Sequence, residues 1–155
     1  MPRKQYGFGT SQDATVFAFT SQGRAPVAMR VRYIPYPEDT IPFFDPVYDL
    51  QFEAWDSRQS DFSVWQEVNN DDAFTILFTV VQTLPLFSQR YPNASILFMG
   101  STDQRGRIFD WYVKRHQGEL STRYDVRGYV DGFWELLGSQ QYGAFLLSPK
   151  KNLLP

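Results

Sequence analysis

The chain has no cysteine among its 155 residues and a single histidine, His116. The absence of cysteine excludes disulfides, thiolate zinc sites, iron–sulfur clusters and cysteine nucleophiles within this chain. One histidine excludes a metal site built from several imidazoles. A carboxylate site for magnesium or calcium stays open, but no pattern in the sequence points to one. We therefore expect neither a metal nor a cofactor.

An excess of basic charge is also missing, since 15 Lys and Arg stand against 17 Asp and Glu, for a formal net charge of −2. This balance excludes a globally basic nucleic-acid-binding protein. One stretch is locally basic and interleaved with tyrosines: Lys114, Arg115, Arg123 and Arg127 with Tyr112, Tyr124 and Tyr129. Such a pattern can bind single-stranded nucleic acid, but it is more typical of a solvated face. We do not expect nucleic acid as a partner.

A long apolar run is missing as well. The longest apolar stretches are interrupted by Thr, Gln or Pro, and no apolar segment follows the polar start of the chain. We therefore expect no signal peptide, no membrane span and a cytoplasmic location. The length and the apolar fraction of 43% predict one domain over residues 1–155, with loose ends at 1–14 and 149–155.

Aromatic residues, in contrast, are abundant and make up 17% of the chain. One interpretation is that a strand-rich domain favours aromatic side chains and packs them in its core. The other is that some of the rings serve a surface that binds a partner. The sequence favours the first interpretation without excluding the second.

Six segments are predicted to be strands. Alternation of apolar and polar residues indicates strands over 15–20, 26–36, 47–55 and 62–68, and short apolar runs indicate buried strands over 95–99 and 144–148. The first two strands are expected to form a hairpin that turns at Gly23. Four prolines over residues 35–46 predict a loop, because proline cannot occupy the interior of a sheet.

Two segments are predicted to be helices. Apolar residues at helical spacing indicate a helix over 71–90, which Pro85 is expected to kink or split. A second helix is expected over 102–117, with Gly118 as its stop. Residues 119–142 fit either strands or irregular structure. The order of elements predicts an α+β fold, a mainly antiparallel sheet of about six strands with two helices packed on one face.

The most specific local pattern is the junction between the strand over 95–99 and the second helix. Gly100, Ser101 and Thr102 break the strand, so the backbone N–H groups of the following helix start point at one spot. Arg105 falls on the apolar face of that helix, whereas Arg107 is expected to face solvent. These five residues are a candidate anion-binding site. The spacing matches neither a Walker A loop nor a dinucleotide fingerprint.

An inward arginine also has an architectural interpretation, in which Arg105 pairs with an internal acid such as Asp71 or Asp72. Those two acids follow Asn69 and Asn70 in a polar cluster. We interpret the cluster as the cap of the first helix or as a possible acid, rather than as a metal site. We expect His116 to have a capping or packing role near a helix end rather than a catalytic one.

The segments Val68-Asn-Asn-Asp71 and Gly100-Ser-Thr102, the latter followed by Arg105 and Arg107, resemble motifs of an uncharacterised family of small bacterial proteins. That family is catalogued as a domain of unknown function. Its pattern has Asn-Asn-Gly-Asp at a helix start and Gly-Ser-Thr-x-x-Arg-x-Arg-Leu-Tyr at a turn and helix. The resemblance covers residues 15–115.

The chain departs from this pattern in two places. Asp71 stands where the family has glycine, so Asp72 matches the family aspartate, and Ile108 and Phe109 replace Leu-Tyr. The family brings no established activity, so the resemblance implies no catalytic residue.

We expect a small intracellular bacterial protein-interaction module that binds a protein partner or forms a homodimer. By analogy with other small bacterial accessory proteins, it would be one half of a toxin–antitoxin or defence pair. The alternative is an enzyme or sensor that binds a phosphate-bearing small molecule or nucleotide at the turn over 100–102.

Overall fold

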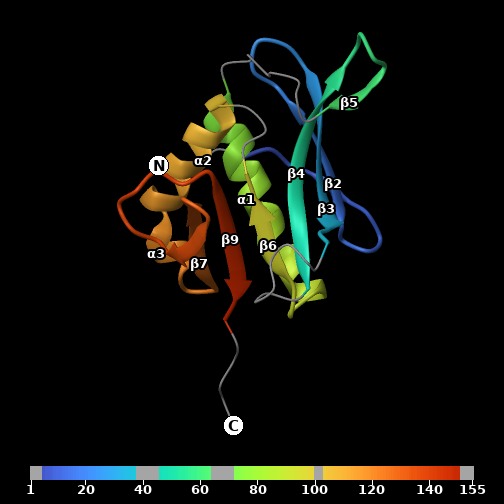
Figure 1. The fold of residues 1–155 in the computed structure, drawn as a ribbon. Coiled ribbons are helices and arrows are strands. Elements are labelled where there is room, and N and C mark those ends of the chain that lie inside the picture. The colour runs from blue at the N-terminus through green and yellow to red at the C-terminus, as the bar shows by residue number, and fades with distance from the viewer. Residues whose placement is uncertain (1–4, 38–45, 64–71, 100–102, 151–155) are drawn as a thin grey trace. The chain divides into compact units, whose positions relative to one another are not determined.

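The computed structural model describes residues 5–37, 46–63, 72–99 and 103–150. The chain packs into two compact units, and Figure 1 labels most of their helices and strands. The first unit comprises residues 1–34 and 51–91, and the second comprises 35–50 and 92–155. Strand β4 (Val47–Asp56) begins in the second unit and ends in the first.

The strands of the first unit lie in the order β1-β2-β3-β4, and β5 pairs with β4. Their bounds are Gly9–Thr10 for β1, Val16–Ser21 for β2, Val27–Pro35 for β3 and Asp61–Ser63 for β5. The β1–β2, β2–β3 and β4–β5 pairs are antiparallel. The predicted hairpin is confirmed, and strand β1 corrects the expectation of a loose lead-in, because Gly9 pairs with Ala18.

The predicted alternation along β2 and β3 is confirmed by burial. Phe17, Val31 and Tyr33 are buried on one face, whereas Arg30 and Arg32 lie on the other. One face of this sheet therefore contributes to the core, and the other carries charge.

Helix α1 (Ala73–Arg90) packs on the apolar face of the first unit. The ring of Phe87 stacks on that of Tyr33 with 4.1 Å between centroids, and the hydroxyls of Tyr33 and Thr83 are 2.7 Å apart. The helix is continuous through Pro85, so the expected split does not occur. Its first residue is Ala73 rather than residue 71.

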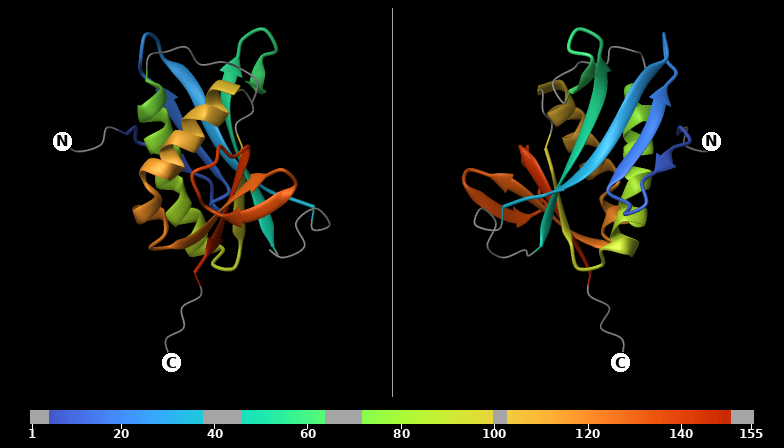
Figure 2. Two further views of the ribbon diagram at one scale, coloured as in Figure 1. Left: turned by 60° about the vertical axis from the view of Figure 1, so that its left-hand side comes forward. Right: turned by 90° about the vertical axis from the view of Figure 1, so that its right-hand side faces the viewer.

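In the second unit the strand order is β4-β6-β9-β7-β8. The bounds are Ser95–Phe98 for β6, Tyr124–Val130 for β7, Phe133–Leu136 for β8 and Ala144–Pro149 for β9. Strand β6 pairs parallel with β4, and the β6–β9, β9–β7 and β7–β8 pairs are antiparallel. Figure 2 shows the β7–β8 hairpin in orange next to β9 in red.

Helices α2 (Asp103–Arg115) and α3 (Gln117–Leu120) belong to the second unit. Phe109 of α2 meets Phe98 of β6 edge to face, 5.0 Å between ring centroids. Gly118 lies inside α3 and does not end a helix as predicted, because the chain turns at His116 and resumes helical structure. Among the described helices, none combines the length and apolarity that a membrane crossing requires.

The α+β class is confirmed, but the described residues form nine strands rather than six and three helices rather than two. The extra strands are β1, β7 and β8. Asp131 and Gly132 join β7 to β8 with φ of +51° and +86°. Positive φ at both residues is the geometry of a type I′ hairpin turn, for which Asp-Gly is a preferred sequence. That dipeptide was the signal in residues 119–142 that would have predicted the hairpin.

Gly128 of β7 has no room for a side chain. A Cβ atom built there would lie 2.3 Å from the buried ring of Tyr142. We predict that Gly128→Ala lowers the free energy of unfolding by about 1–3 kcal/mol, because the ring must move out of a packed site. Urea denaturation measures this. Gly106→Ala is the matched control, since its Cβ would meet no atom within 4 Å, and a helical alanine should raise the free energy of unfolding. Equal effects of the two changes would contradict the close packing.

Candidate functional site

Most of the predicted anion site lies outside the described residues. Gly100, Ser101 and Thr102 are not described, and for Arg105, which falls in α2, the side chain is not described. Arg107 is exposed on α2, as expected. The anion-binding site therefore stays a prediction.

The predicted cap of α1 is described only at its last residue, because Asn69, Asn70 and Asp71 lie outside the described residues. Asp72 occupies the N-cap position, but its side chain makes no capping hydrogen bond. Its Oδ2 instead accepts hydrogen bonds from the hydroxyls of Tyr6 and Ser21, each at 2.5 Å. Asp72 therefore stands at the N-cap position without the side-chain capping hydrogen bond that the sequence predicts.

Tyr6, Ser21, Asp72 and Thr79 form a cluster that we call the Tyr6 clasp. The Tyr6 backbone N–H donates to Thr79 Oγ1 at 2.8 Å, and the Gln22 N–H donates to the Tyr6 hydroxyl at 2.9 Å. Ser21 and Thr79 are fully buried. These contacts attach the N-terminal segment to β2 and α1. The clasp was not predictable from the sequence, because its members are far apart in the chain.

A shallow groove of about 420 Å³ borders the clasp, lined by residues of the N-terminal segment and β2 that include Tyr6, Phe8, Phe19 and Gln22. Asp72 Oδ1 is buried and accepts no hydrogen bond from any described residue. Burial raises the pKa of the Tyr6 phenol above its usual 10.0, and the hydrogen bond to Asp72 raises it further. The phenol therefore stays protonated at neutral pH and acts as a donor, which fits an attachment role.

Because the pKa of Tyr6 is raised on folding, the protonated phenol contributes stability in full below pH 10, and this contribution is lost as pH rises through the folded-state value. We predict that Tyr6→Phe lowers the free energy of unfolding by about 1 kcal/mol at neutral pH. The difference from the unmodified protein should shrink above pH 10. Urea denaturation from pH 7 to 11 measures it, with Tyr129→Phe as the control for loss of an exposed phenol. A pH-independent difference would contradict the role of the phenol.

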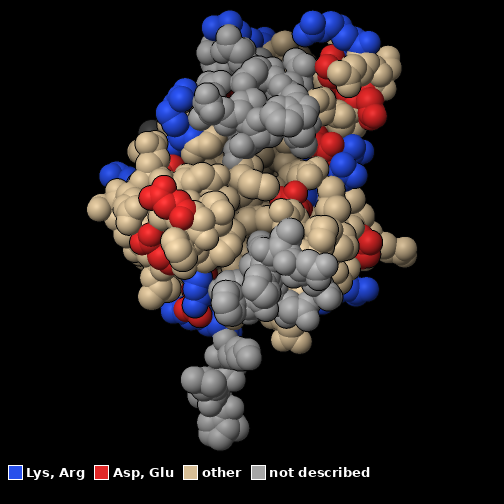
Figure 3. Space-filling view, viewed as in Figure 1, with Lys and Arg blue, Asp and Glu red and all other residues tan. Residues whose placement is uncertain are grey.

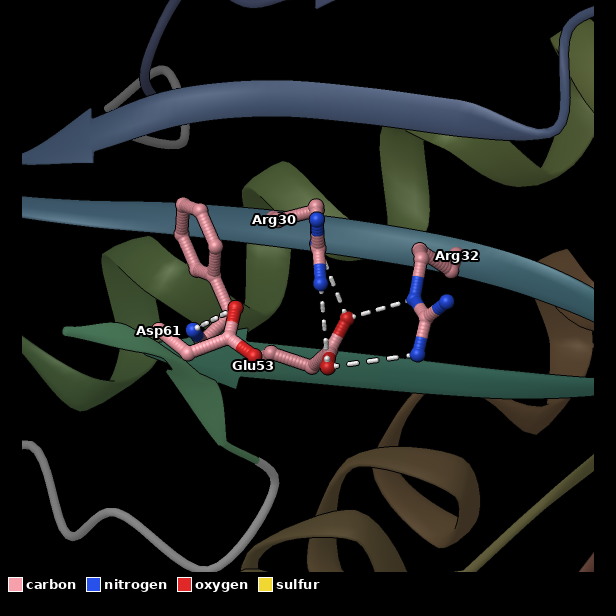
Figure 4. Close-up of polar contacts among 5 residues, drawn as sticks. Arg30, Arg32, Glu53 and Asp61 are labelled. Atoms are coloured by element: carbon pink, nitrogen blue, oxygen red, sulfur yellow. Dashed lines mark hydrogen bonds and ion pairs between the residues drawn. The ribbon is translucent and has the colours of Figure 1, made fainter. Parts of the chain in front are cut away.

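Two arginines share one carboxylate on the outer face of the first unit's sheet. Arg30 Nε and Arg32 Nε lie 3.0 and 2.7 Å from Glu53 Oε1. Glu53 is 4% exposed, whereas the guanidinium groups are partly accessible. Figure 4 shows both arginines reaching from β3 toward Glu53 on β4. The Arg30 guanidinium also lies 4.3 Å from the centre of the Phe62 ring.

The Arg30–Glu53–Arg32 cluster carries a net charge of +1, because one carboxylate neutralises one of the two guanidinium charges. Removal of Glu53 would leave two guanidinium groups side by side without their shared counter-charge, so the carboxylate stabilises the contact between β3 and β4. The sequence carried part of the signal, since Arg30 and Arg32 alternate with apolar residues along β3. Their partner could not be predicted, because strand register across β3 and β4 is not readable from either segment. We interpret the cluster as structural.

His116 lies between α2 and α3, at the N-cap position of α3. Its ring packs on that of Tyr112 at 4.3 Å, and Nδ1 lies 3.5 Å from Glu119 Oε1. These contacts agree with the packing role expected for this residue. Among the described residues, no three His, Cys, Asp or Glu side chains come together as metal ligands would.

A polar network holds the segment that follows β8. Asp110 of α2 is buried, accepts the Tyr142 backbone N–H at 3.2 Å and pairs with Lys114 Nζ at 3.0 Å. The Tyr142 hydroxyl accepts the Gly138 N–H at 2.7 Å, and its ring lies against Gly128. Helix α2 therefore positions Tyr142, and Tyr142 supports the β7–β8 hairpin from beneath.

The exposed apolar residues of this hairpin are the most prominent surface feature. Phe133 is 73% and Leu136 is 67% exposed, the highest values among the large apolar side chains that the structure describes. Tyr129, 41% exposed, contacts Trp134 across the strands at 5.2 Å between ring centroids. Trp134 in turn packs on the buried cluster of Val47, Leu97, Ala144 and Leu146.

Strand β8 also ends the strand order of its unit, and no described strand pairs with its outer side. In an antiparallel pair closed by a two-residue turn, alternate residues point their N–H and C=O groups at the partner strand. The backbone N–H and C=O groups of Phe133 and Glu135 therefore bond to β7. The backbone N–H and C=O groups of Trp134 and Leu136 point away from β7. A hydrogen bond of Tyr129, the residue paired with Trp134, supports this assignment. The Tyr129 carbonyl accepts the Gly143 N–H, which lies on the side of β7 away from β8.

We call the outward side of Phe133–Leu136 the β8 edge. It combines backbone donors and acceptors that pair with no described strand and two exposed apolar side chains. Figure 3 shows basic and acidic side chains interspersed with uncharged surface on the visible face. An edge strand with exposed apolar residues is a template for pairing with another chain. The β8 edge is therefore the candidate functional site.

Comparison with known proteins gives a family without an activity. The model of a family of unknown function (DUF6934) matches residues 2–150. No curated protein and no solved structure gives a significant match. The match to the family model covers nearly the whole chain, so the chain belongs to this family of unknown function.

Proposed function

We propose that the protein is a protein-interaction module and that its docking site is the β8 edge. The observation that carries the proposal is the exposure of Phe133 and Leu136 on a strand whose outer backbone groups no described residue uses. A partner segment in extended conformation adds a strand there by forming backbone hydrogen bonds with Trp134 and Leu136. Apolar side chains of that segment cover Leu136 on one face of β8 and Phe133 on the other.

The site is supported as a rigid platform. The type I′ turn sets the register of the hairpin, and the Tyr142 ring packs against Gly128 directly behind it. Strand β7 is held on its other side by six residue pairs with β9. A preorganised edge costs little conformational entropy when a partner strand binds.

The alternative function, an enzyme or sensor for a phosphate-bearing ligand, depends on Gly100, Ser101 and Thr102. Those residues lie outside the described part of the chain. No described contact favours that function, and none bears on membership of a toxin–antitoxin or defence pair. Both stay predictions from the sequence.

Photo-crosslinking tests the docking edge. We predict that p-benzoylphenylalanine in place of Phe133 forms an adduct with another protein in the native cells. The same group in place of Phe74, a 52% exposed residue of α1, should form none. Mass spectrometry of the adducts measures both. Adducts at equal yield from both positions would contradict the proposal, because they would report exposure rather than docking.

A proline variant supplies the control for backbone pairing. Leu136→Pro removes an outward N–H and leaves the β7 bonds intact, so the hairpin should persist while the adduct from position 133 disappears. Leu136→Ser keeps the N–H and should only weaken the adduct. Circular dichroism checks that both variants fold.

A further inference from the structure

We infer that the β8 edge accepts a partner strand in which apolar residues alternate with a lysine or arginine, and that it excludes a second copy of this chain. The inference rests on the proposed docking function and names the chemistry of the partner. The inference is based on the charge of Glu135, the acidic residue within the exposed strand.

The Glu135 carboxylate lacks a cationic partner among the described residues. Its contacts are weak: Gln140 Nε2 lies 3.3 and 3.4 Å from the two carboxylate oxygens, and the Tyr142 hydroxyl lies 3.5 Å from Oε2. The residue is half-buried. A partly desolvated carboxylate with only neutral, long hydrogen bonds leaves most of its capacity to accept charge-assisted bonds unused.

The two faces of β8 differ in chemistry. Trp134 and Leu136 share one face, on which Trp134 packs against the buried cluster of the second unit. Phe133 and Glu135 share the other. In a strand added to the edge, every second side chain therefore lies beside Trp134 or Leu136, and the residue between them lies opposite Glu135. An apolar–basic–apolar sequence satisfies all three positions.

The β8 strand of a second copy of the chain does not place a basic residue opposite Glu135. Two β8 strands that pair antiparallel and use the outward groups of both Trp134 and Leu136 must set Trp134 of one copy opposite Leu136 of the other. Glu135 then faces the Glu135 of the second copy. Like charges directly opposite destabilise a strand pair, and a charge on an edge strand is a recognised barrier to edge-to-edge association.

A charge-reversal experiment tests the inference with the full-length protein. The probes are two fluorescein-labelled extended peptides, one with Val-Lys-Val at its centre and a twin with Val-Glu-Val. Fluorescence anisotropy measures binding of each peptide to the unmodified protein and to Glu135→Lys. We expect the lysine peptide to bind the unmodified protein about fivefold more tightly than its twin, and Glu135→Lys to reverse the preference.

The outcomes separate this inference from the docking function. If both peptides bind equally to both proteins and Leu136→Pro abolishes binding, the docking edge stands and the charge inference is overturned. If neither peptide binds, or if Leu136→Pro leaves binding unchanged, the docking edge itself is overturned. A dimer of the unmodified protein in sedimentation analysis that Leu136→Pro dissociates would overturn the exclusion of a second copy.

Discussion

The structure around β8 depends on one constraint, the register of the hydrogen bonds between β7 and β8. This register decides which residues of β8 bond to β7 and which direct their backbone groups outward. Asp131 and Gly132 close the hairpin with positive φ at both positions, and this turn fixes which residues of β8 bond inward. A shift of one residue would turn every side chain of the strand to the opposite face. The outward N–H groups of Trp134 and Leu136, the exposure of Leu136 and the position of Glu135 all follow from one turn.

Side-chain packing against the β7–β8 hairpin stabilises this register. Gly128 is the position where the Tyr142 ring reaches the backbone of β7, and Asp110 holds the Tyr142 backbone from α2. In the first unit, Glu53 of β4 binds both Arg30 and Arg32 of β3 and so links two neighbouring strands by charge. In each unit a buried carboxylate therefore binds a segment that is distant in sequence: Asp110 binds the backbone of Tyr142, and Glu53 binds the arginines of β3.

Much of the fold was predictable, because its signals are local. Alternation gave β2, β3 and β4, and apolar runs gave β6 and β9, within one or two residues. The missed strands had signals of another kind. Strand β1 is two residues long, too short for any periodicity, and β7 with β8 required the Asp131–Gly132 turn to be recognised. Helix α1 was predicted, but its carboxylate at Asp72 serves Tyr6 and Ser21, residues more than 50 positions away.

The candidate site was not predictable from single residues, because the run over 133–137 fits either a strand or irregular structure and does not show which of its side chains are covered. Only the strand order shows that nothing described covers them. Amide hydrogen exchange tests this directly. We predict fast exchange at the N–H groups of Trp134 and Leu136 and slow exchange at those of Phe133 and Glu135. Slow exchange at Trp134 and Leu136 in the isolated protein would contradict it, because those groups would already be bonded.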